Sequence, residues 1–521
     1  MTRKHWRCYH GQMSRSTHSP SRRSLLQAAL AAGAAPLFVR HALAADQPRF
    51  ALGVASGFAQ PDGIVLWTLV SGEGLPAQVA VDWEMAQDEA FTRVQARGRE
   101  WAVPEDAYSV HAEAAGLAPD RWYWYRFTAL GQRSPVGRTR TAPARGAEVD
   151  RLRFAIASCQ RYDHGRYAAW ADCARRELDF VFFLGDYIYE NATPADRNPP
   201  RRHEGPRCEL LSDYRRRHAQ YKSDPHLQAA HAGAPWFLIW DDHDIENDWA
   251  GNVSERLTEH FERQRAAAAK AYWEHLPFPK SRRPDAWSML INERYDWGAL
   301  ARIIAIDDRQ WRDQQVCPKP GRGGGTTVSA SICPEVFDPK RTMLGPAQEQ
   351  WLAAQWDASK PWNLLAQQTL MAGLNWEPDK SKPPTIWTDG WDGYPEPRRR
   401  LLADLAARDL PNTVVLGGDV HANFVADLRV TPEGPIVATE FCGTSITSEG
   451  MRQSQLDQAL PHNPQLHYGR SEERGYASFE LTPGGLTAEL RTVNEIWRDD
   501  SPVETAARFF VEAGRPGAQR A

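Results

Sequence analysis

The sequence predicts an α/β protein preceded by an all-β domain, and two patterns along the chain support this prediction. From residue 50 to about residue 144, short strands alternate with turn signals, and helical periodicity is weak. From residue 151 onward, continuous apolar strands alternate with helices, which is typical of buried parallel or mixed sheets that helices cover. The length of 521 residues allows roughly two to four domains.

The first 44 residues have the features of a removable export signal. Arg22 and Arg23 form a twin-arginine pair, an Ala-rich apolar run follows over 27–39, and Ala42-Leu43-Ala44 provides a cleavage site. The apolar run is too short to span a bilayer. We therefore predict cleavage after Ala44, the twin-arginine export machinery as a partner, and a periplasmic or secreted protein without a stable membrane span. A disordered tail or an uncleaved anchor helix is the alternative.

The charge of the chain after residue 44 excludes one class of partner. Residues 1–44 hold seven Lys or Arg and no Asp or Glu, which leaves 55 basic and 66 acidic residues and a net charge of about −11. An acidic chain of this kind does not indicate nucleic-acid binding, and its carboxylates suit divalent cations.

The region 45–145 is predicted to be a β-sandwich of the immunoglobulin or fibronectin kind. Strands are expected at 63–70, 78–84 and 122–127, with a turn at 117–120. No cluster of catalytic residue types occurs here. We expect a structural or substrate-shaping role for this domain.

The region 150–495 is predicted to be the catalytic α/β domain, and residues 496–521 a C-terminal tail. Helices are expected at 167–176, 259–276, 347–359 and 398–408. Strands are expected at 153–158, 180–184, 236–240, 300–306, 363–368, 413–416, 436–441 and 486–493. Two long surface loops are expected at 191–207 and 318–342.

Two of the cysteines are predicted to form a disulfide. Cys317 and Cys333 flank a Gly-rich loop in a protein that we expect in an oxidising compartment. The other four cysteines after residue 44 lack metal-type spacing such as C-x-x-C, so each is by default a small buried hydrophobe.

Four of the predicted strand ends carry chemically reactive side chains. Carboxyl ends of parallel strands lie side by side at one edge of a sheet, so these groups are expected to converge. Each residue also has a plain structural explanation, such as a helix cap, a core aromatic or an inert thiol. The residues are Cys159, Asp186, Tyr189, Asp241, Asp242, His243, Asp244, Asp419 and His421.

The ligand types at these strand ends favour a metal site. Carboxylates suit hard cations such as Ca²⁺, whereas a thiolate and a phenolate favour a strongly Lewis-acidic ion such as Fe³⁺. A carboxylate can bridge two ions, and Asp186 is placed to do so.

These motifs resemble the metallophosphoesterase blocks in the form found in PhoD-type alkaline phosphatases and phosphodiesterases. The resemblance rests on Gly185-Asp186 with Tyr189, on 240–244 and on 418–421. It extends to the stretches 50–57, 61–63, 157–160, 341–345, 391–395 and 438–445, and so covers nearly the whole chain after residue 44.

The resemblance implies a four-layer αββα catalytic core behind an N-terminal β-sandwich, with iron and calcium as the metals. Position by position, it implies that Fe³⁺ is bound by Cys159, Asp186, Tyr189 and His421, and that Ca²⁺ is bound by Asp242 and Asp419 with Asp186 as the bridge. One departure from related phosphoesterases is Gly418-Asp419 where a histidine is usual, and this favours calcium over a two-histidine zinc or manganese site.

The mechanism implied by these residues is hydrolysis of a phosphate ester. Metal ions neutralise the phosphoryl oxygens and lower the pKa of a bound water, so that hydroxide attacks phosphorus in line with the ester oxygen. His243 is expected to protonate the leaving group as a general acid. Arg161 is a candidate phosphate contact, with a surface arginine as the alternative.

The leading hypothesis is therefore an exported alkaline phosphatase that hydrolyses phosphomonoesters and also phosphodiesters. One alternative is a phosphodiesterase or phospholipase D-like enzyme that uses the same metals. The other is a noncatalytic exported binding protein stabilised by calcium, a reading that the 21 tryptophans and the β-sandwich favour.

Overall fold

The computed structural model describes residues 48–379, 381–408, 410 and 412–521. The predicted export signal at residues 1–44 lies outside these residues and stays a prediction. Residues Arg49–Ser71 and Leu75–Ala521 belong to one structural unit, to which the following description applies. In the described part of the chain, no helix combines the length and apolar character that a membrane span requires.

The N-terminal strands divide between two sheets. One has five strands: β3 (Val79–Ala86), β4 (Val94–Ala102), β6 (Trp122–Ala129), β7 (Gln132–Arg133) and β8 (Gly137–Arg140). The strands β1 (Val54–Gly57), β2 (Gly63–Leu69) and β5 (Ser109–Ala115) pair with one another at the end of the other sheet. In β6, Tyr123, Tyr125 and Phe127 are buried while their neighbours are partly exposed, which is the alternation expected of a strand with one face on a core. The predicted all-β domain is therefore present.

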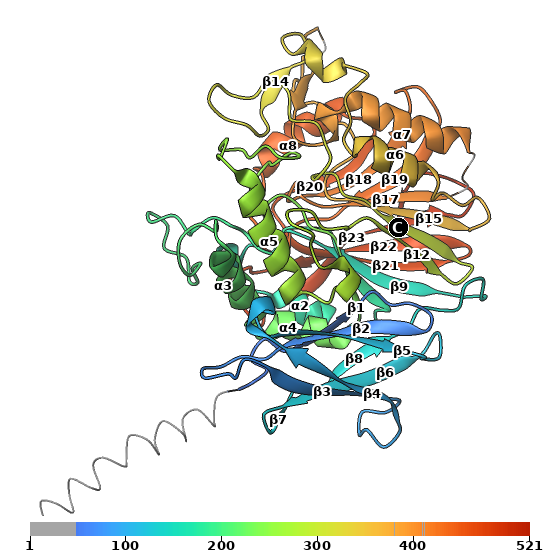
Figure 1. The fold of residues 1–521 in the computed structure, drawn as a ribbon. Helices are drawn as coiled ribbons and strands as arrows, with labels where there is room; N and C mark the ends of the chain where they lie inside the picture. The colour runs from blue at the N-terminus through green and yellow to red at the C-terminus, as the bar shows by residue number, and fades with distance from the viewer. Residues whose placement is uncertain (1–47, 380, 409, 411) are drawn as a thin grey trace, which may run out of the picture. The chain divides into compact units, whose positions relative to one another are not determined.

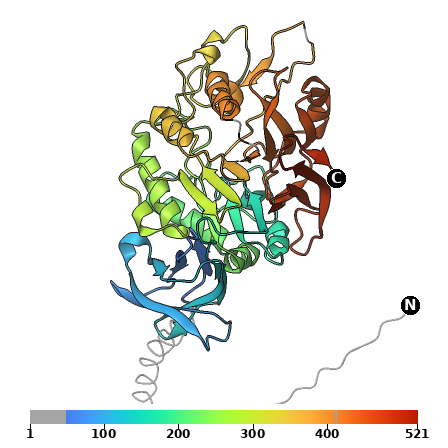
Figure 2. The same ribbon diagram turned by 90° about the vertical axis from the view of Figure 1, so that its right-hand side faces the viewer.

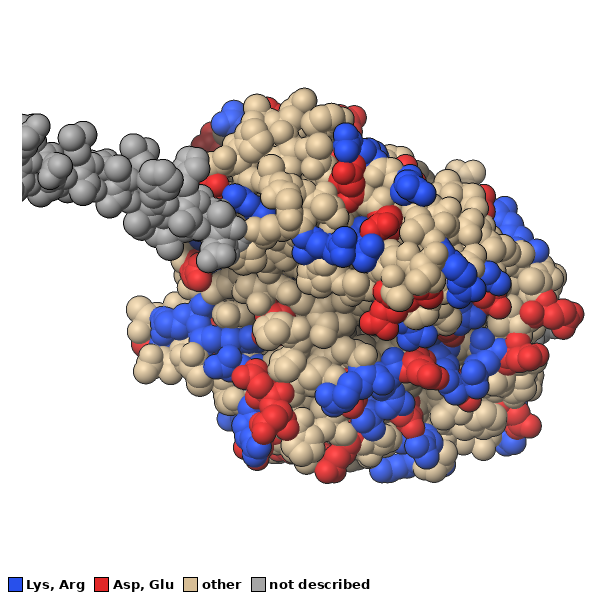
Figure 3. Space-filling view, turned by 90° about the horizontal axis from the view of Figure 1, so that it is seen from below, with Lys and Arg blue, Asp and Glu red and all other residues tan. Residues whose placement is uncertain are grey.

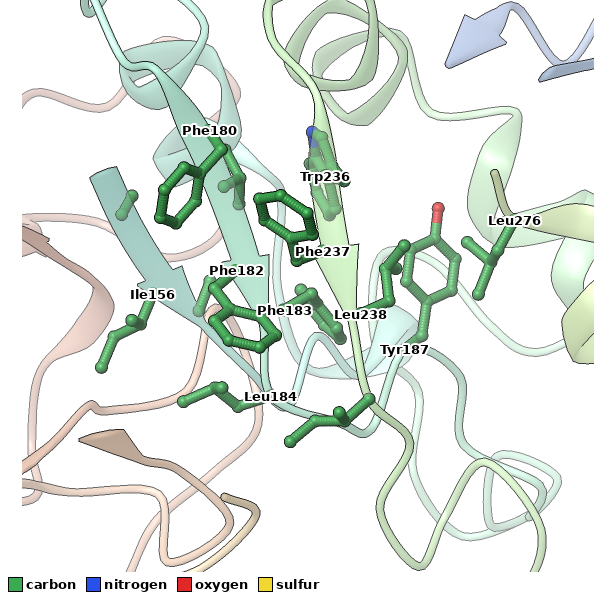
Figure 4. Close-up of a cluster of buried hydrophobic side chains, with 14 of the residues drawn as sticks. Ile156, Phe180, Phe182, Phe183, Leu184, Tyr187, Trp236, Phe237, Leu238 and Leu276 are labelled. Carbon is green, nitrogen blue, oxygen red and sulfur yellow. The ribbon is translucent and has the colours of Figure 1, made fainter. Parts of the chain in front are cut away.

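The strands β1, β2 and β5 also continue into a ten-stranded sheet, because β1 pairs in parallel with β11 (Trp236–Leu238). The order of this sheet is β24-β23-β22-β21-β9-β10-β11-β1-β2-β5. Its further strands are β9 (Leu152–Ala157), β10 (Phe180–Phe183), β21 (Arg474–Thr482), β22 (Gly485–Val493), β23 (Val503–Glu512) and β24 (Gln519–Arg520). The central strands β9, β10 and β11 are parallel, so their carboxyl ends share one edge. Figure 4 shows the aromatic side chains of β10 and β11, such as Phe180, Phe182 and Phe237, packed around this centre.

A second sheet has seven strands, in the order β12-β13-β15-β17-β19-β18-β20. They are β12 (Glu293–Trp297), β13 (Ala301–Ala305), β15 (Trp362–Ala366), β17 (Thr413–Gly417), β18 (Asn423–Arg429), β19 (Ile436–Cys442) and β20 (Leu466–Arg470). Neighbouring strands from β13 to β19 are parallel. A separate two-stranded sheet joins β14 (Thr327–Ser329) to β16 (Thr385–Trp387).

The two large sheets pack face to face between helices. In β17, Val414 and Leu416 belong to the core shared with the ten-stranded sheet, whereas Val415 belongs to the core beneath α6 (Gly345–Ala353) and α7 (Pro395–Ala407). The rings of Phe441 in β19 and Phe479 in β21 join the sheets, with their centroids 5.5 Å apart. Figure 1 shows α6 and α7 over one sheet and α2 (Ala168–Cys173) and α4 (Pro225–Gly233) below the other. The remaining helices are α3 (Leu211–Lys222), α5 (Phe261–His275) and α8 (Gln453–Ala459). The predicted αββα arrangement is confirmed.

The C-terminal residues differ from the prediction. Residues 496–521 were expected to be a tail, but β23 pairs with β22 from Gly485↔Glu512 to Val493↔Val503. Ala507, Phe509 and Val511 are buried and alternate with more exposed residues, which is the pattern of a strand with one face on a core and could have identified it. Figure 2 shows these red strands beside the teal strands from near residue 150, in agreement with the pairing of β21 with β9.

The cysteines behave as predicted. Cys317 and Cys333 form a disulfide, and Cys159, Cys173, Cys208 and Cys442 are buried free thiols. On the surface seen in Figure 3, basic and acidic side chains are interspersed.

Candidate metal centre and active site

The reactive side chains lie where strands of both sheets end. Cys159, Asp186 and Asp242 follow β9, β10 and β11 of the ten-stranded sheet, whereas Asp419 and His421 follow β17 of the seven-stranded sheet. The site therefore forms where the carboxyl edges of two stacked sheets meet, and not along the edge of one.

The backbone turns sharply at four of these residues. Cys159, Asp186, Asp419 and His421 have φ angles of 57°, 58°, 65° and 53°, in the left-handed region that non-glycine residues rarely adopt. Such strained positions cluster at functional sites, where the surrounding structure holds them. Gly185 allows the close approach, because a Cβ at this position would lie 2.3 Å from Cβ of Asp241.

One group of candidate ligands consists of Cys159, Asp186, Tyr189 and His421. Potential ligand atoms of Cys159, Asp186 and His421 lie within 4.8 Å of one another, and the hydroxyl of Tyr189 is 3.1 Å from Nε2 of His421. His421 is oriented by a contact of 2.7 Å between its Nδ1 and the carbonyl oxygen of Glu449, which leaves Nε2 toward the group.

Two observations fit a cation at this group. Oδ2 of Asp186 is buried and has no hydrogen-bond partner among the residues that the structure describes. Burial, together with the charge of Asp186, raises the pKa values of the Cys159 thiol and the Tyr189 phenol well above their usual range. Both groups would therefore stay protonated unless a cation replaced their protons.

A second group of candidate ligands consists mainly of carboxylates and shares Asp186 with the first group. Asp241, Asp242 and Asp419 offer oxygens within 4.8 Å of one another, and so do Asp186 and Asp242 with a ring nitrogen of His243. Asp186 thus lies in both groups, as a bridging ligand must. The structure brings together all six residues that were predicted as metal ligands.

Asp241 is paired with a residue that sequence reasoning missed. Arg309, just past β13, is fully buried and donates to Asp241 and, at 2.7 Å, to Oδ2 of Asp389. Its Nη2 also lies 3.9 Å from Oδ2 of Asp419. The signal was available, because Asp307-Asp308-Arg309 follows an apolar strand in the same way as the other motifs.

Asp244 organises the turn and belongs to neither group of candidate ligands. Its carboxylate accepts hydrogen bonds from the backbone N–H groups of Asp186, Tyr187 and Asp241 at 2.9 Å each, and of Ile188 at 3.2 Å. It therefore fastens the loop after β10 to the loop after β11.

His243 is held by a second residue without a predicted role. Its Nδ1 lies 2.7 Å from Oε2 of Glu190, whose side chain is fully buried. Burial alone would lower the pKa of His243, but Glu190, Asp242 and Asp186 raise it to about 10. An imidazolium of this kind can donate a proton at alkaline pH.

Arg161 lies beside Tyr189 but outside the two groups of candidate ligands. Its Nε donates to Oδ1 of Asp163 at 2.8 Å, its guanidinium lies 5.3 Å from the ring centroid of Tyr189, and it does not line the cavity described next. The ion pair with Asp163 accounts for this position.

A cavity of about 430 Å³ opens onto the ligand groups. This volume is within the range of about 300–1,000 Å³ that is typical of small-molecule sites. Its polar lining residues include Asp186, Asp242, His243, Asp419 and His421. Its apolar lining residues include Leu370, Leu374, Trp376, Trp387, Trp391 and Met451.

Comparison with known proteins identifies the family. The family model of the PhoD-like phosphatases matches residues 154–490, and the model of their N-terminal domain matches residues 34–143. The chain belongs to the PhoD-like phosphatase family. It is 40% identical over 489 residues to alkaline phosphatase D of Bacillus subtilis (strain 168), across 90% of this chain and 82% of that protein. A solved structure of PhoD matches with a TM-score of 0.86 and 39% identity, across 91% of this chain and 92% of that one.

The comparisons confirm the resemblance found in the sequence. The protein is an enzyme, a phosphoric ester hydrolase of the alkaline phosphatase D type. The alternative of a noncatalytic binding protein is thereby set aside.

Proposed function

We propose that this PhoD-like phosphatase is an exported, metal-dependent alkaline phosphatase that hydrolyses phosphomonoesters and also phosphodiesters. Fe³⁺ would be held by Cys159, Asp186, Tyr189 and His421, and Ca²⁺ by Asp186, Asp242 and Asp419. The observation that carries the proposal is the grouping of a thiol, a phenol, an imidazole and an unpartnered carboxylate oxygen in one buried cluster. Thiolate and phenolate ligands favour iron, and carboxylates favour calcium.

When bound, the ions would supply positive charge for the phosphoryl oxygens and lower the pKa of a water molecule. The chain's own part is to position the ester and to deliver a proton. His243 lines the cavity next to Asp242, and the carboxylate of Glu190 raises its pKa, which favours the protonated ring for transfer to the departing alkoxide. Glu190 holds the ring with Nδ1 toward itself, so Nε2 is the atom that would donate the proton.

Export is supported by the disulfide between Cys317 and Cys333, since such bonds persist in oxidising compartments. Replacing Arg22 and Arg23 with lysine tests the twin-arginine route. We expect the precursor to remain in the cytoplasm, and undiminished export would contradict this part of the proposal.

The metals and the reaction are tested together with protein purified without tags or chelators. We expect iron and calcium in the wild type and loss of iron in Cys159→Ala. We also expect turnover of 4-nitrophenyl phosphate and of bis(4-nitrophenyl) phosphate at alkaline pH. Calcium without iron would contradict the ferric site, and turnover of the diester alone would favour the phosphodiesterase or phospholipase D-like alternative. Absence of both reactions in metal-loaded protein would contradict the proposal as a whole.

A further inference from the structure

The cavity has more apolar lining than a phosphate group needs. Phosphate is bound by charge and hydrogen bonds, and the polar lining residues offer both. The tryptophans, leucines and methionine have no role in binding a phosphoryl group. Because they line the same cavity as the candidate ligands, they are available to the alcohol part of an ester.

Trp387 is the most exposed of these side chains, at 38% of its surface, and its position is fixed. It ends β16, where it pairs with Thr327 of β14. Its ring lies against the backbone of Gly325, because a Cβ at that position would be 3.0 Å from Cζ2 of Trp387. A large, exposed aromatic surface held in this way is a ready-made platform for a planar group.

Hydrogen bonds from backbone N–H groups connect Gly325, against which Trp387 packs, to the candidate ligand Asp242. The N–H of Gly325 donates to Oδ2 of Asp248 at 2.8 Å, and the N–H of Asp248 donates to Oδ2 of Asp242 at 2.8 Å. The disulfide between Cys317 and Cys333 closes the loop that carries Gly325 and β14. The disulfide and these two hydrogen bonds therefore fix the distance between Trp387 and the carboxylate of Asp242.

We infer that the enzyme takes phosphate esters with an aromatic substituent on the ester oxygen, and that Trp387 is the specificity-determining residue that binds this substituent. The inference rests on the proposed function, since it assigns the second half of the same site. Trp376 lines the same cavity, and the phosphoryl group lies at the carboxylates.

The test uses two competitive inhibitors that share a phosphonate group and differ in their substituent, phenylphosphonate and methylphosphonate. We expect Trp387→Ala to raise the Ki of phenylphosphonate by about tenfold, the size expected from loss of one aromatic contact, and to change that of methylphosphonate by less than about threefold. Trp387→Phe should retain most of the phenyl preference. The matched control is Trp497→Ala, because Trp497 is 37% exposed and does not line the cavity.

The outcomes separate this inference from the proposed function. If Trp387→Ala weakens both phosphonates equally or neither, while the wild type hydrolyses 4-nitrophenyl phosphate, the inference is overturned and the proposed function stands. If the metal-loaded wild type hydrolyses no ester, the proposed function itself fails. Should Trp387→Ala not fold, as judged by thermal unfolding, Trp376→Ala replaces it, and an unchanged ratio of the two Ki values in that variant also overturns the inference.

Discussion

Nδ1 of His243 lies 2.7 Å from Oε2 of Glu190, and both side chains are largely removed from solvent. Glu190 also has an oxygen 3.5 Å from Nη2 of Arg207. Cations bound to Asp186 and Asp242 would offset the effect of these two carboxylates on the pKa of His243. Glu190 would then be the anion that keeps the imidazole protonated. This pair therefore sets the pH range in which His243 can act as an acid.

We expect Glu190→Gln to lower the pH above which activity is lost. His243 can donate a proton only while it is protonated, so activity is lost as the pH rises through its pKa. Because Glu190 raises that pKa, its neutralisation should move the alkaline limb of the kcat/KM profile down by about 1 pH unit or more. The measurement is a pH profile with 4-nitrophenyl phosphate.

Glu246→Gln is the matched control for this experiment. Glu246 is equally buried and also contacts Arg207, at 3.1 Å, but it does not contact His243. Its replacement should leave the alkaline limb in place. An unshifted limb in Glu190→Gln would remove His243 from the role of general acid.

Asp244→Ala is expected to release iron as well as to lower stability. The substitution leaves four buried N–H groups without their acceptor, at a cost of about 1–3 kcal/mol for each one that water cannot reach. Because these groups fix Asp186, the iron content should fall. Thermal unfolding and metal analysis report the two effects separately.

Asp224→Ala distinguishes local disorder from general destabilisation. Asp224 is also buried, accepts from His226 N and pairs with Arg201, but it lies outside the ligand groups. It should lower stability and retain iron. Equal loss of iron in both variants would mean that Asp244 has no particular role at the metal centre.

The sequence predicted the parts of the fold that depend on local pattern. The strand expected at 413–416 is β17 at Thr413–Gly417, because an unbroken apolar run followed by Gly418-Asp419 leaves few other conformations. The sequence shows that Arg309 follows a strand, but its pairing with Asp241 could not be predicted, since that depends on how β13 of one sheet faces β11 of the other. The four converging strand ends were expected at one edge, and local pattern alone does not reveal that two sheets supply them.

Phe509→Ala tests whether the C-terminal residues belong to the core. Phe509 is 2% exposed, and its ring centroid lies 5.6 Å from that of Tyr468 and 6.4 Å from that of Phe441. Its truncation should lower the free energy of unfolding by about 3–5 kcal/mol. Arg508→Ala, a change in the exposed neighbour, should have little effect. An unchanged melting temperature in Phe509→Ala would restore the prediction of a tail.

A buried lysine is expected to make the enzyme more stable at alkaline pH. Nζ of Lys222 lies 4.0 Å from the ring centroid of Trp67, and burial lowers the pKa of Lys222 well below its usual value. Burial also lowers the pKa of the neighbouring His218 well below its usual value and that of His275 to about 3. The unfolded chain therefore binds more protons than the folded one below the ordinary pKa of each group, so stability is lost as the pH falls.

Lys222→Met should remove the part of the pH dependence of stability that lies between about pH 7 and pH 10. Between about pH 7 and pH 10, His218 and His275 are neutral in both states, so among these three groups Lys222 is the one that contributes, by up to about 1.4 kcal/mol of stability per pH unit. Methionine keeps the apolar length without the amine, and the variant should be more stable than the wild type at pH 7 and similar to it near pH 10. Thermal unfolding across this range measures the effect, with the exposed Lys280→Met as the control. Parallel curves for Lys222→Met and the wild type would show that the amine stays charged in the folded protein.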